Sequence, residues 1–215
     1  MKAIGTCSVT RLTVGQMQEN CYVVQDKTSG KTMIIDPGDD GEYIIDQLTK
    51  LETIPIAIIV THGHFDHIMA GYQLQFAYSI PLLLHADDLF LLSSMQASAK
   101  HFLGIPFVDP PPIASKTVSN NDIVALGRHS FTVIHTPGHT PGSICLYSKE
   151  HTMIFTGDTV LKHGQRGRTD FSYSDKNKLL QSIENIFTLP DATWVYAGHG
   201  DVTTIGEERM FWEGI

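Results

Sequence analysis

The heptapeptide THGHFDH, residues 61–67, constrains this chain more than any other stretch, because it brings four metal-binding side chains into seven residues. It directly follows the apolar run 56–60, whose β-branched residues predict a buried strand. A helical metal site would place its histidines four residues apart on one face, whereas His62, His64 and Asp66 recur at every second position. The pattern therefore predicts a metal-binding loop at the end of a strand, with a helix of roughly ten residues beginning inside the motif.

Three further residues of ligand type occur in similar settings. Each follows a predicted strand and has glycine close by: His139 in TPGHTPGS, Asp158 in TGDT and His199 in AGHG. Small neighbours allow the backbone to turn sharply and a substrate to approach. Because the loops at one rim of two packed sheets lie together, we expect these three residues to meet the first cluster.

The combined set contains five histidines and two aspartates, which are His62, His64, Asp66, His67, His139, Asp158 and His199. A catalytic zinc takes three protein ligands, so seven candidates predict two divalent ions. Ions about 3.5 to 4 Å apart can share one carboxylate and can hold a water that ionises near neutral pH. Nitrogen and carboxylate ligands without thiolate suit zinc, iron or manganese; we expect zinc first and keep iron and manganese as alternatives.

Composition limits the class of protein. A chain of 215 residues, 42% hydrophobic and 18% charged, predicts one globular domain over residues 1–215. Its 15 basic and 23 acidic residues give a net charge of −8, which disfavours nucleic-acid partners. We expect a small-molecule substrate instead, and the sequence does not indicate an oligomeric state.

Targeting signals are not evident in the sequence. No stretch has the apolar core of a secretory signal or the roughly 18 apolar residues of a membrane span, so we expect a cytoplasmic protein without a membrane partner. The three cysteines, Cys7, Cys21 and Cys145, are widely spaced and predict neither a disulfide framework nor a C-x-x-C metal knuckle.

Hydrophobic periodicity predicts two similar halves, each with a meander of strands, a helix and a further strand. Two sheets packed on each other with helices outside, an α/β architecture, satisfy this pattern. The Pro-rich segment 104–116 is predicted to be a surface loop. The predicted strands are 9–14, 21–24, 32–35, 56–60, 81–84, 122–126, 130–135, 143–147, 152–156 and 193–197, and the main helices are 43–51, 87–100 and 175–187.

The motif set T-H-x-H-x-D-H, G-H-T-P-G-S, G-D-T and G-H-G resembles the metallo-β-lactamase fold superfamily, and specifically its short glyoxalase II-like hydrolases. The resemblance covers nearly the whole chain. It implies an αβ/βα four-layer sandwich, with two mixed sheets face to face and the site at the rim. It also implies the assignment of ligands: one ion held by His62, His64 and His139, the other by Asp66, His67 and His199, and both bridged by Asp158. Asn20 and Asp36 also resemble family positions, and we interpret them as turn residues that orient ligands by hydrogen bonds.

The leading hypothesis is a metal-dependent hydrolase that cleaves a thioester such as S-D-lactoylglutathione, with a hydroxide between two ions as nucleophile and Asp66 steadying it. Full-length glyoxalase II carries a C-terminal helical region that binds glutathione. This chain ends sixteen residues after His199 and is expected to have no such domain. The family's substrate therefore transfers less directly than its fold.

A mononuclear-iron persulfide dioxygenase is the runner-up. The segment GRTDF at residues 167–171 resembles a motif shared by short glyoxalase II-like proteins and persulfide dioxygenases of the same superfamily. In that family a single iron is held by two histidines and a carboxylate, here His62, His139 and Asp158. Arg168 and Asp170 would then contact substrate, although a structural pairing that pins the loop is the preferred interpretation.

Other classes rank lower. Subclass B3 β-lactamases share the first motif but lack a bridging aspartate and are exported, so Asp158 and the missing signal argue against them. Flavodiiron proteins place a glutamate where His64 stands, and tRNA-processing relatives carry an RNA-binding arm. A metal-binding interaction domain without catalysis is the non-enzyme alternative, and the intact ligand set argues against it. His163, which follows Asp158 closely, is a further candidate for contact with substrate.

Overall fold

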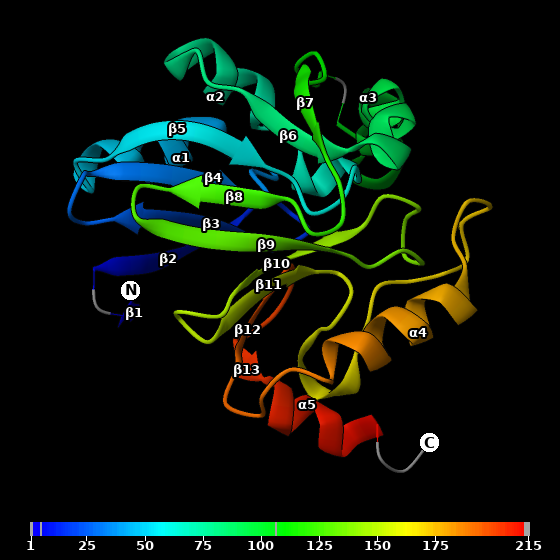
Figure 1. Ribbon diagram of the computed structural model, residues 1–215. Coiled ribbons are helices and arrows are strands. Elements are labelled where there is room, and N and C mark those ends of the chain that lie inside the picture. Colours follow the sequence, from blue (N-terminus) through cyan, green and yellow to red (C-terminus); the bar gives the residue numbers. More distant parts are fainter. Residues whose placement is uncertain (1, 5, 106, 213–215) are drawn as a thin grey trace.

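The computed structural model describes residues 2–4, 6–105 and 107–212. Its strands form two sheets that lie face to face (Figure 1). The seven-stranded sheet has the order β1 (Lys2–Ile4), β2 (Cys7–Val14), β3 (Glu19–Asp26), β4 (Lys31–Ile35), β5 (Ile54–Ile59), β6 (Leu82–His85), β7 (Ala114–Val118). The six-stranded sheet has the order β13 (Thr203–Thr204), β12 (Trp194–Ala197), β11 (Met153–Gly157), β10 (Ile144–Ser148), β9 (His129–His135), β8 (Ile123–Leu126).

Helices cover the outer face of each sheet. Figure 1 shows α1, α2 and α3 on the outer side of the seven-stranded sheet and α4 and α5 on the outer side of the other. Their bounds are α1 (Gly41–Lys50), α2 (Gly71–Tyr78), α3 (Leu89–Leu103), α4 (Lys176–Ile186) and α5 (Ile205–Trp212), with short 3-10 turns at Phe65–His67, Ala86–Asp88 and Lys162–Gly164. None of the helices in the described ranges is long and apolar enough to cross a bilayer. The four-layer αβ/βα arrangement predicted from the sequence is confirmed.

Three hydrophobic clusters fill the spaces between the four layers. One lies between α1 to α3 and the seven-stranded sheet, and includes Leu48 and Leu74. The central cluster joins the two sheets and includes Phe131 and Phe155, both fully buried. The third packs α4 and α5 against the six-stranded sheet through residues such as Ile183. Burial of these alternating apolar side chains stabilises the sandwich and fixes which ends of the strands share a rim.

Both sheets are mixed, and their parallel parts position the predicted site. Strands β4, β5, β6 and β7 are parallel neighbours, and β12 is parallel to β11. The remaining pairs are antiparallel, including β2 with β3 and β9 with β10. Strands β5, β11 and β12 therefore deliver their C-terminal loops to the same rim of the sandwich.

Two predicted elements differ from the structure. The helix predicted to begin inside the THGHFDH motif is present, but its predicted start is wrong: a 3-10 turn spans Phe65–His67, and α2 begins only at Gly71. The backbone N–H of Ala70 bonds to Pro37 O, 3.1 Å away, instead of continuing the helical ladder, so a tertiary contact interrupts the helix. The predicted loop 104–116 also contains the start of β7, a largely exposed edge strand whose polar sequence gave no strand signal. Pro106 of that loop lies outside the described residues.

Candidate metal centre

Loops after four strands bring the seven predicted ligand residues together. The loop after β5 carries His62, His64, Asp66 and His67, while β9, β11 and β12 are followed by His139, Asp158 and His199. Ligand atoms within each of three overlapping groups lie within 4.8 Å of one another: His62 with His64 and His139, His62 with His67 and Asp158, and Asp66 with His67 and His199. Residues nearly 140 positions apart in the sequence thus form one cluster.

Asp158 lies between the two halves of the cluster. Its Oδ2 is 3.5 Å from His139 Nε2. Its Oδ1 is 3.7 Å from His67 Nε2 and 3.8 Å from His199 Nε2. The two oxygens of one carboxylate therefore face different groups of ligands, which is the arrangement that a bridging ligand requires. Gly198 permits this approach, because a Cβ at that position would lie 2.6 Å from Asp158 Oδ1.

Hydrogen bonds at the far ring nitrogens orient the histidines. His67 Nδ1 donates to Asp36 Oδ2 at 3.1 Å, which directs Nε2 toward Asp158. His139 Nδ1 donates to the backbone oxygen of Arg168 at 2.8 Å, which leaves Nε2 facing the cluster. His64 uses Nε2 for the hydroxyl of Tyr173, 2.9 Å away, and turns Nδ1 toward His62. Such partners fix the tautomer of a metal-binding imidazole and its ring orientation.

Electrostatics in the cluster are dominated by burial and by the mixture of imidazoles and carboxylates. Burial, with the neighbouring histidines, holds the pKa of His62 well below its usual value and lowers the pKa of His64 to about 3. Burial also opposes charge on His67, but its bond to Asp36 and the carboxylates nearby raise its pKa to about 9. The pKa of Asp66 falls despite burial, because His199 and His67 favour the charged form. Neutral imidazoles and ionised carboxylates are the forms that bind a cation.

The residues fit a divalent metal pair. Within the described part of the chain, His139 Nε2 and Asp158 Oδ1 are buried and have no hydrogen-bond partner. A buried polar atom without a partner costs about 1 to 3 kcal/mol, and a cation at the cluster would satisfy both atoms. The donor set of nitrogen and carboxylate oxygen suits zinc, iron or manganese.

A cavity of about 220 Å³ opens onto the cluster. Its apolar lining comes from the loop after β2, from α3 and from the segment after β11, and that last segment also contributes Arg166 and Arg168. Its lining includes Met17, Leu91, Phe102, Leu161, Phe171 and Tyr173 beside the ligand residues His64, Asp66, His139, Asp158 and His199.

The three candidate substrate contacts lie in different places. Arg168 lines the cavity, but its guanidinium donates two bonds of 2.5 Å to Asp170, as the structural pairing expects. Asp170 is exposed and is not among the lining residues. His163 is also exposed, and its ring lies edge-on to Phe211 of α5 with centroids 5.8 Å apart. The backbone of the 167–171 segment contributes more to the centre than its charged side chains, since Gly167 approaches His139 so closely that a Cβ would lie 2.5 Å from Nδ1.

Asp36 bonds to the ligand residue His67, in agreement with its interpretation from the sequence. Two other residues around the centre, Asp88 and Glu19, were not identified from the sequence. Asp88 is fully buried and accepts bonds from the backbone of Gly63 and from Thr140, so it ties the first loop to the His139 loop. Glu19 is buried behind His67, 3.7 Å from Nδ1, and burial raises its pKa well above the usual value. No local motif marks Asp88 or Glu19, because their roles come from contacts between distant segments.

Comparison with known proteins gives consistent matches over most of the chain. Residues 14–199 match the family described as the metallo-beta-lactamase superfamily. A protein of Haemophilus influenzae named hydroxyacylglutathione hydrolase GloC is 35% identical over 198 residues, covering 91% of this chain and 92% of that protein. A Bacillus subtilis protein named probable metallo-hydrolase YqgX is 34% identical over 209 residues, covering 95% of this chain and 97% of that protein.

Three solved structures agree with the fold over most of the chain. BLEG-1, named a B3 metallo-beta-lactamase, has a TM-score of 0.87 at 35% identity and covers 94% of this chain and 97% of its own. TTHA1623 in a di-iron-bound form has a TM-score of 0.85 at 35% identity with the same coverage. ETHE1 from Myxococcus xanthus has a TM-score of 0.77 at 27% identity and covers 94% of this chain and 81% of its own.

Proposed function

Because this chain belongs to the metallo-β-lactamase superfamily, we propose that it is a hydrolase with two divalent ions that cleaves the thioester of a small acyl compound. The observation that carries the proposal is the position of Asp158, whose two oxygens face two separate groups of ligands. His62, His64 and His139 would hold one ion and Asp66, His67 and His199 the other, with Asp158 shared. When bound, such a pair polarises a carbonyl oxygen and supplies a water that ionises near neutral pH.

The chain's own residues prepare the reaction in three ways. Asp66 stays ionised despite burial, since its neighbouring histidines favour the carboxylate, and it can accept a hydrogen bond that orients the attacking water. Asp36, Tyr173 and the backbone of Arg168 fix the rings of three ligand histidines, so that little reorganisation is needed during the reaction. The two-ion reading is further supported by the di-iron form of TTHA1623, 35% identical to this chain.

The apolar lining of the cavity and the name of one relative both support a thioester substrate. The apolar lining with Met17, Leu91 and Phe102 suits the hydrocarbon and sulfur part of a substrate and excludes water from it. Arg166 lines the same cavity and supplies a positive charge that an acidic group of the substrate could approach, while its guanidinium lies 5.0 Å above the Trp212 ring. The name hydroxyacylglutathione hydrolase, carried by a relative at 35% identity, describes a substrate of this chemistry.

The test is a metal and activity measurement on protein purified without chelator. Elemental analysis should give at least two ions per chain, and Asp158→Ala should reduce both metal content and turnover. The substrate panel is S-D-lactoylglutathione, other thioesters, lactones and nitrocefin. Full activity of metal-free protein would overturn the proposal, and selective cleavage of nitrocefin, the outcome expected of a protein like BLEG-1, would replace the thioester by a β-lactam.

A mononuclear-iron persulfide dioxygenase is the second candidate. It is motivated by the adjacency of His139 and Asp158, 3.5 Å apart, with His62 beside His139, its ring centroid 4.7 Å away. It is also motivated by the likeness to ETHE1 from Myxococcus xanthus, which has a TM-score of 0.77 at 27% identity. An oxygen electrode with glutathione persulfide and iron-loaded protein separates the two candidates. Rapid oxygen uptake at one iron per chain supports the dioxygenase, and thioester cleavage without uptake supports the hydrolase.

A further inference from the structure

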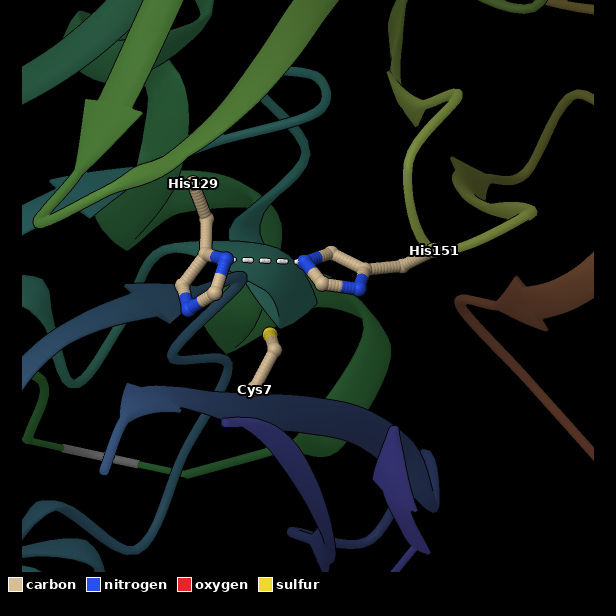
Figure 2. Close-up of side chains that lie close together, drawn as sticks. All are labelled: Cys7, His129 and His151. Carbon is tan, nitrogen blue, oxygen red and sulfur yellow. Dashed lines mark hydrogen bonds between the residues drawn. The ribbon is translucent and has the colours of Figure 1, made fainter. Parts of the chain in front are cut away.

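A second cluster of metal-binding side chains lies apart from the catalytic rim, between the two sheets (Figure 2). Cys7 begins β2 in one sheet, while His129 begins β9 and His151 lies in the turn between β10 and β11 in the other. The sulfur of Cys7 and one ring nitrogen of each histidine lie within 4.8 Å of one another. The exposed fractions of Cys7, His129 and His151 are 1%, 1% and 6%, so a polar cluster is buried here.

The cluster lies at the rim opposite the catalytic cavity. Strand β9 has His129 at its first residue and leads at its other end to the His139 loop. Strand β2 likewise starts at Cys7 and ends beside the loop that holds Met17, a residue of the cavity wall. In Figure 1 the β8–β9 turn, immediately before His129, is at the left end of the sandwich. The two sites therefore share no side chain.

The rings of the two histidines face each other. His151 Nε2 and His129 Nδ1 are 2.9 Å apart, and Figure 2 shows Cys7 directed from the opposite side toward the line between them. Two imidazole nitrogens on one tetrahedral zinc are about 3.3 Å apart, given Zn–N bonds of about 2.0 to 2.1 Å. The pair needs to open by only about 0.4 Å to accept an ion.

A fourth ligand faces the same point. Glu150 Oε2 is 3.7 Å from His129 Nδ1 and 3.7 Å from His151 Nε2. Its side chain is 52% exposed, so it connects the buried cluster to solvent and gives a route for an ion to enter. One sulfur, two nitrogens and one carboxylate oxygen make the four-ligand set of a closed structural zinc site.

A carboxylate behind His129 sets the ring for this role. His129 Nε2 lies 3.5 Å from Asp26 Oδ1 and 3.4 Å from Thr6 Oγ1, and a proton on Nε2 facing these oxygens would leave the lone pair of Nδ1 directed at the cluster. Asp26 is itself held by Ser29 and by the backbone of Thr28, and Gly127 makes room for it, since a Cβ there would lie 2.0 Å from Oδ2. A carboxylate paired with the far nitrogen is the usual support of a metal-bound histidine.

We propose that Cys7, His129, Glu150 and His151 form a structural site for one zinc-class divalent ion that links the two sheets. A histidine pair that only fills space accounts for one hydrogen bond, but it does not account for a thiol and a carboxylate placed around the same two nitrogens. Burial, with Asp26 and Glu150 nearby, raises the pKa of Cys7 to about 12. The thiol therefore keeps its proton until an ion displaces it on binding.

Cobalt(II) titration of metal-free protein tests this site separately from the catalytic one. A thiolate bound to cobalt gives an intense near-ultraviolet charge-transfer band, and the catalytic cluster contains no thiol among its ligand residues. We expect the band to reach, at saturating cobalt, the intensity of one cobalt–thiolate site per chain in the unmodified protein. Its absence at saturating cobalt would overturn the proposal, whatever the catalytic centre binds, so this proposal and the proposed function fail independently.

Three variants identify the ligands. Cys7→Ser and His151→Gln should lose the band while thioester turnover stays within twofold of the unmodified protein, because neither residue contacts the catalytic cavity. Cys145→Ser is the matched control: its sulfur is equally buried but lies 3.5 Å from Thr136 Oγ1 and outside the cluster, so the band should persist. A band that survives in Cys7→Ser would overturn the assignment. His151 lies in a turn, so His151→Gln gives an answer even if the strand residue cannot be replaced.

Added zinc should also raise the midpoint of thermal unfolding through this site. The catalytic ions contribute equally in the unmodified protein and in Cys7→Ser, so the difference between their zinc-induced shifts isolates the second site. We expect a larger upward shift in the unmodified protein. Equal shifts would contradict a role in linking the sheets.

Discussion

Replacement of Asp36 by asparagine should weaken metal binding at the catalytic centre without removing any ligand. Asp36 is 2% exposed, and its Oδ2 accepts bonds from the Thr61 hydroxyl at 2.6 Å and from His67 Nδ1 at 3.1 Å. In Asp36→Asn, the Thr61 backbone N–H, which bonds Oδ1 at 2.6 Å, keeps the amide oxygen on its side. The amide nitrogen then faces His67 Nδ1 with a donor.

Two donors cannot pair, so His67 must either lose this bond or move its proton to Nε2. The second choice removes the lone pair that faces Asp158, 3.7 Å away. Loss of such an orienting partner typically costs about 10- to 100-fold in metal affinity. This corresponds to about 1.4 to 2.8 kcal/mol of binding free energy, and turnover should fall in proportion to metal occupancy.

The assay is competition between the protein and a chromophoric chelator for zinc, measured beside thioester turnover. Asp46→Asn is the matched control, because Asp46 is exposed and its side chain bonds to Lys50, 2.6 Å away, and to Gln47, 3.2 Å away, both on α1 and far from the centre in the sequence. Far-ultraviolet circular dichroism checks that both variants are folded. Unchanged zinc affinity in folded Asp36→Asn would refute the reasoning that the far nitrogen of His67 controls the centre.

Three further outcomes are expected. Zinc binding at pH 7 should release a proton, because metal-free His67 has its pKa raised to about 9 and must become neutral to bind. Calorimetry at pH 7 in two buffers of different ionisation heat measures this release, and zinc affinity should rise between pH 7 and 9. An affinity that stays constant over that range would contradict the prediction. Tyr173→Phe should lower zinc affinity by about 2- to 12-fold in the same chelator assay, since a net hydrogen bond to His64 contributes about 0.5 to 1.5 kcal/mol, and an effect below twofold would count against an orienting role. Phe131→Ala, fully buried between the sheets, should reduce the free energy of unfolding in urea by about 3 to 5 kcal/mol, whereas Phe107→Ala, 90% exposed, should change it by less than about 0.5 kcal/mol; similar values for the two would contradict the assigned core.

The sequence by itself predicted the class of fold and the residues that the structure brings together in the candidate metal centre. The spacing of His62, His64 and Asp66 is incompatible with one face of a helix, and the apolar run before them is too short for anything but a buried strand. Glycine beside His139 and His199 marked the other loops, since only small residues tolerate such close approach. Alternation of apolar residues predicted most strands to within a few positions, including β9 and β11.

Tertiary structure decided what local pattern does not encode. The bond from Ala70 to Pro37 O shortened the helix expected after the motif, and the polar strand β7 formed because β6 offered it a parallel partner. Asp88 and Glu19 lie at the centre because they contact Thr140 and His67, which are far from them in the sequence. Cys7 and His151 gave no signal in the sequence, since Cys7 lies in one sheet, His151 lies in a turn of the other, and 144 residues separate them. Only the packing of sheet on sheet places such residues side by side, because burial of the central apolar cluster fixes how the two sheets are aligned. Neither segment, taken alone, contains a sequence pattern that predicts this alignment.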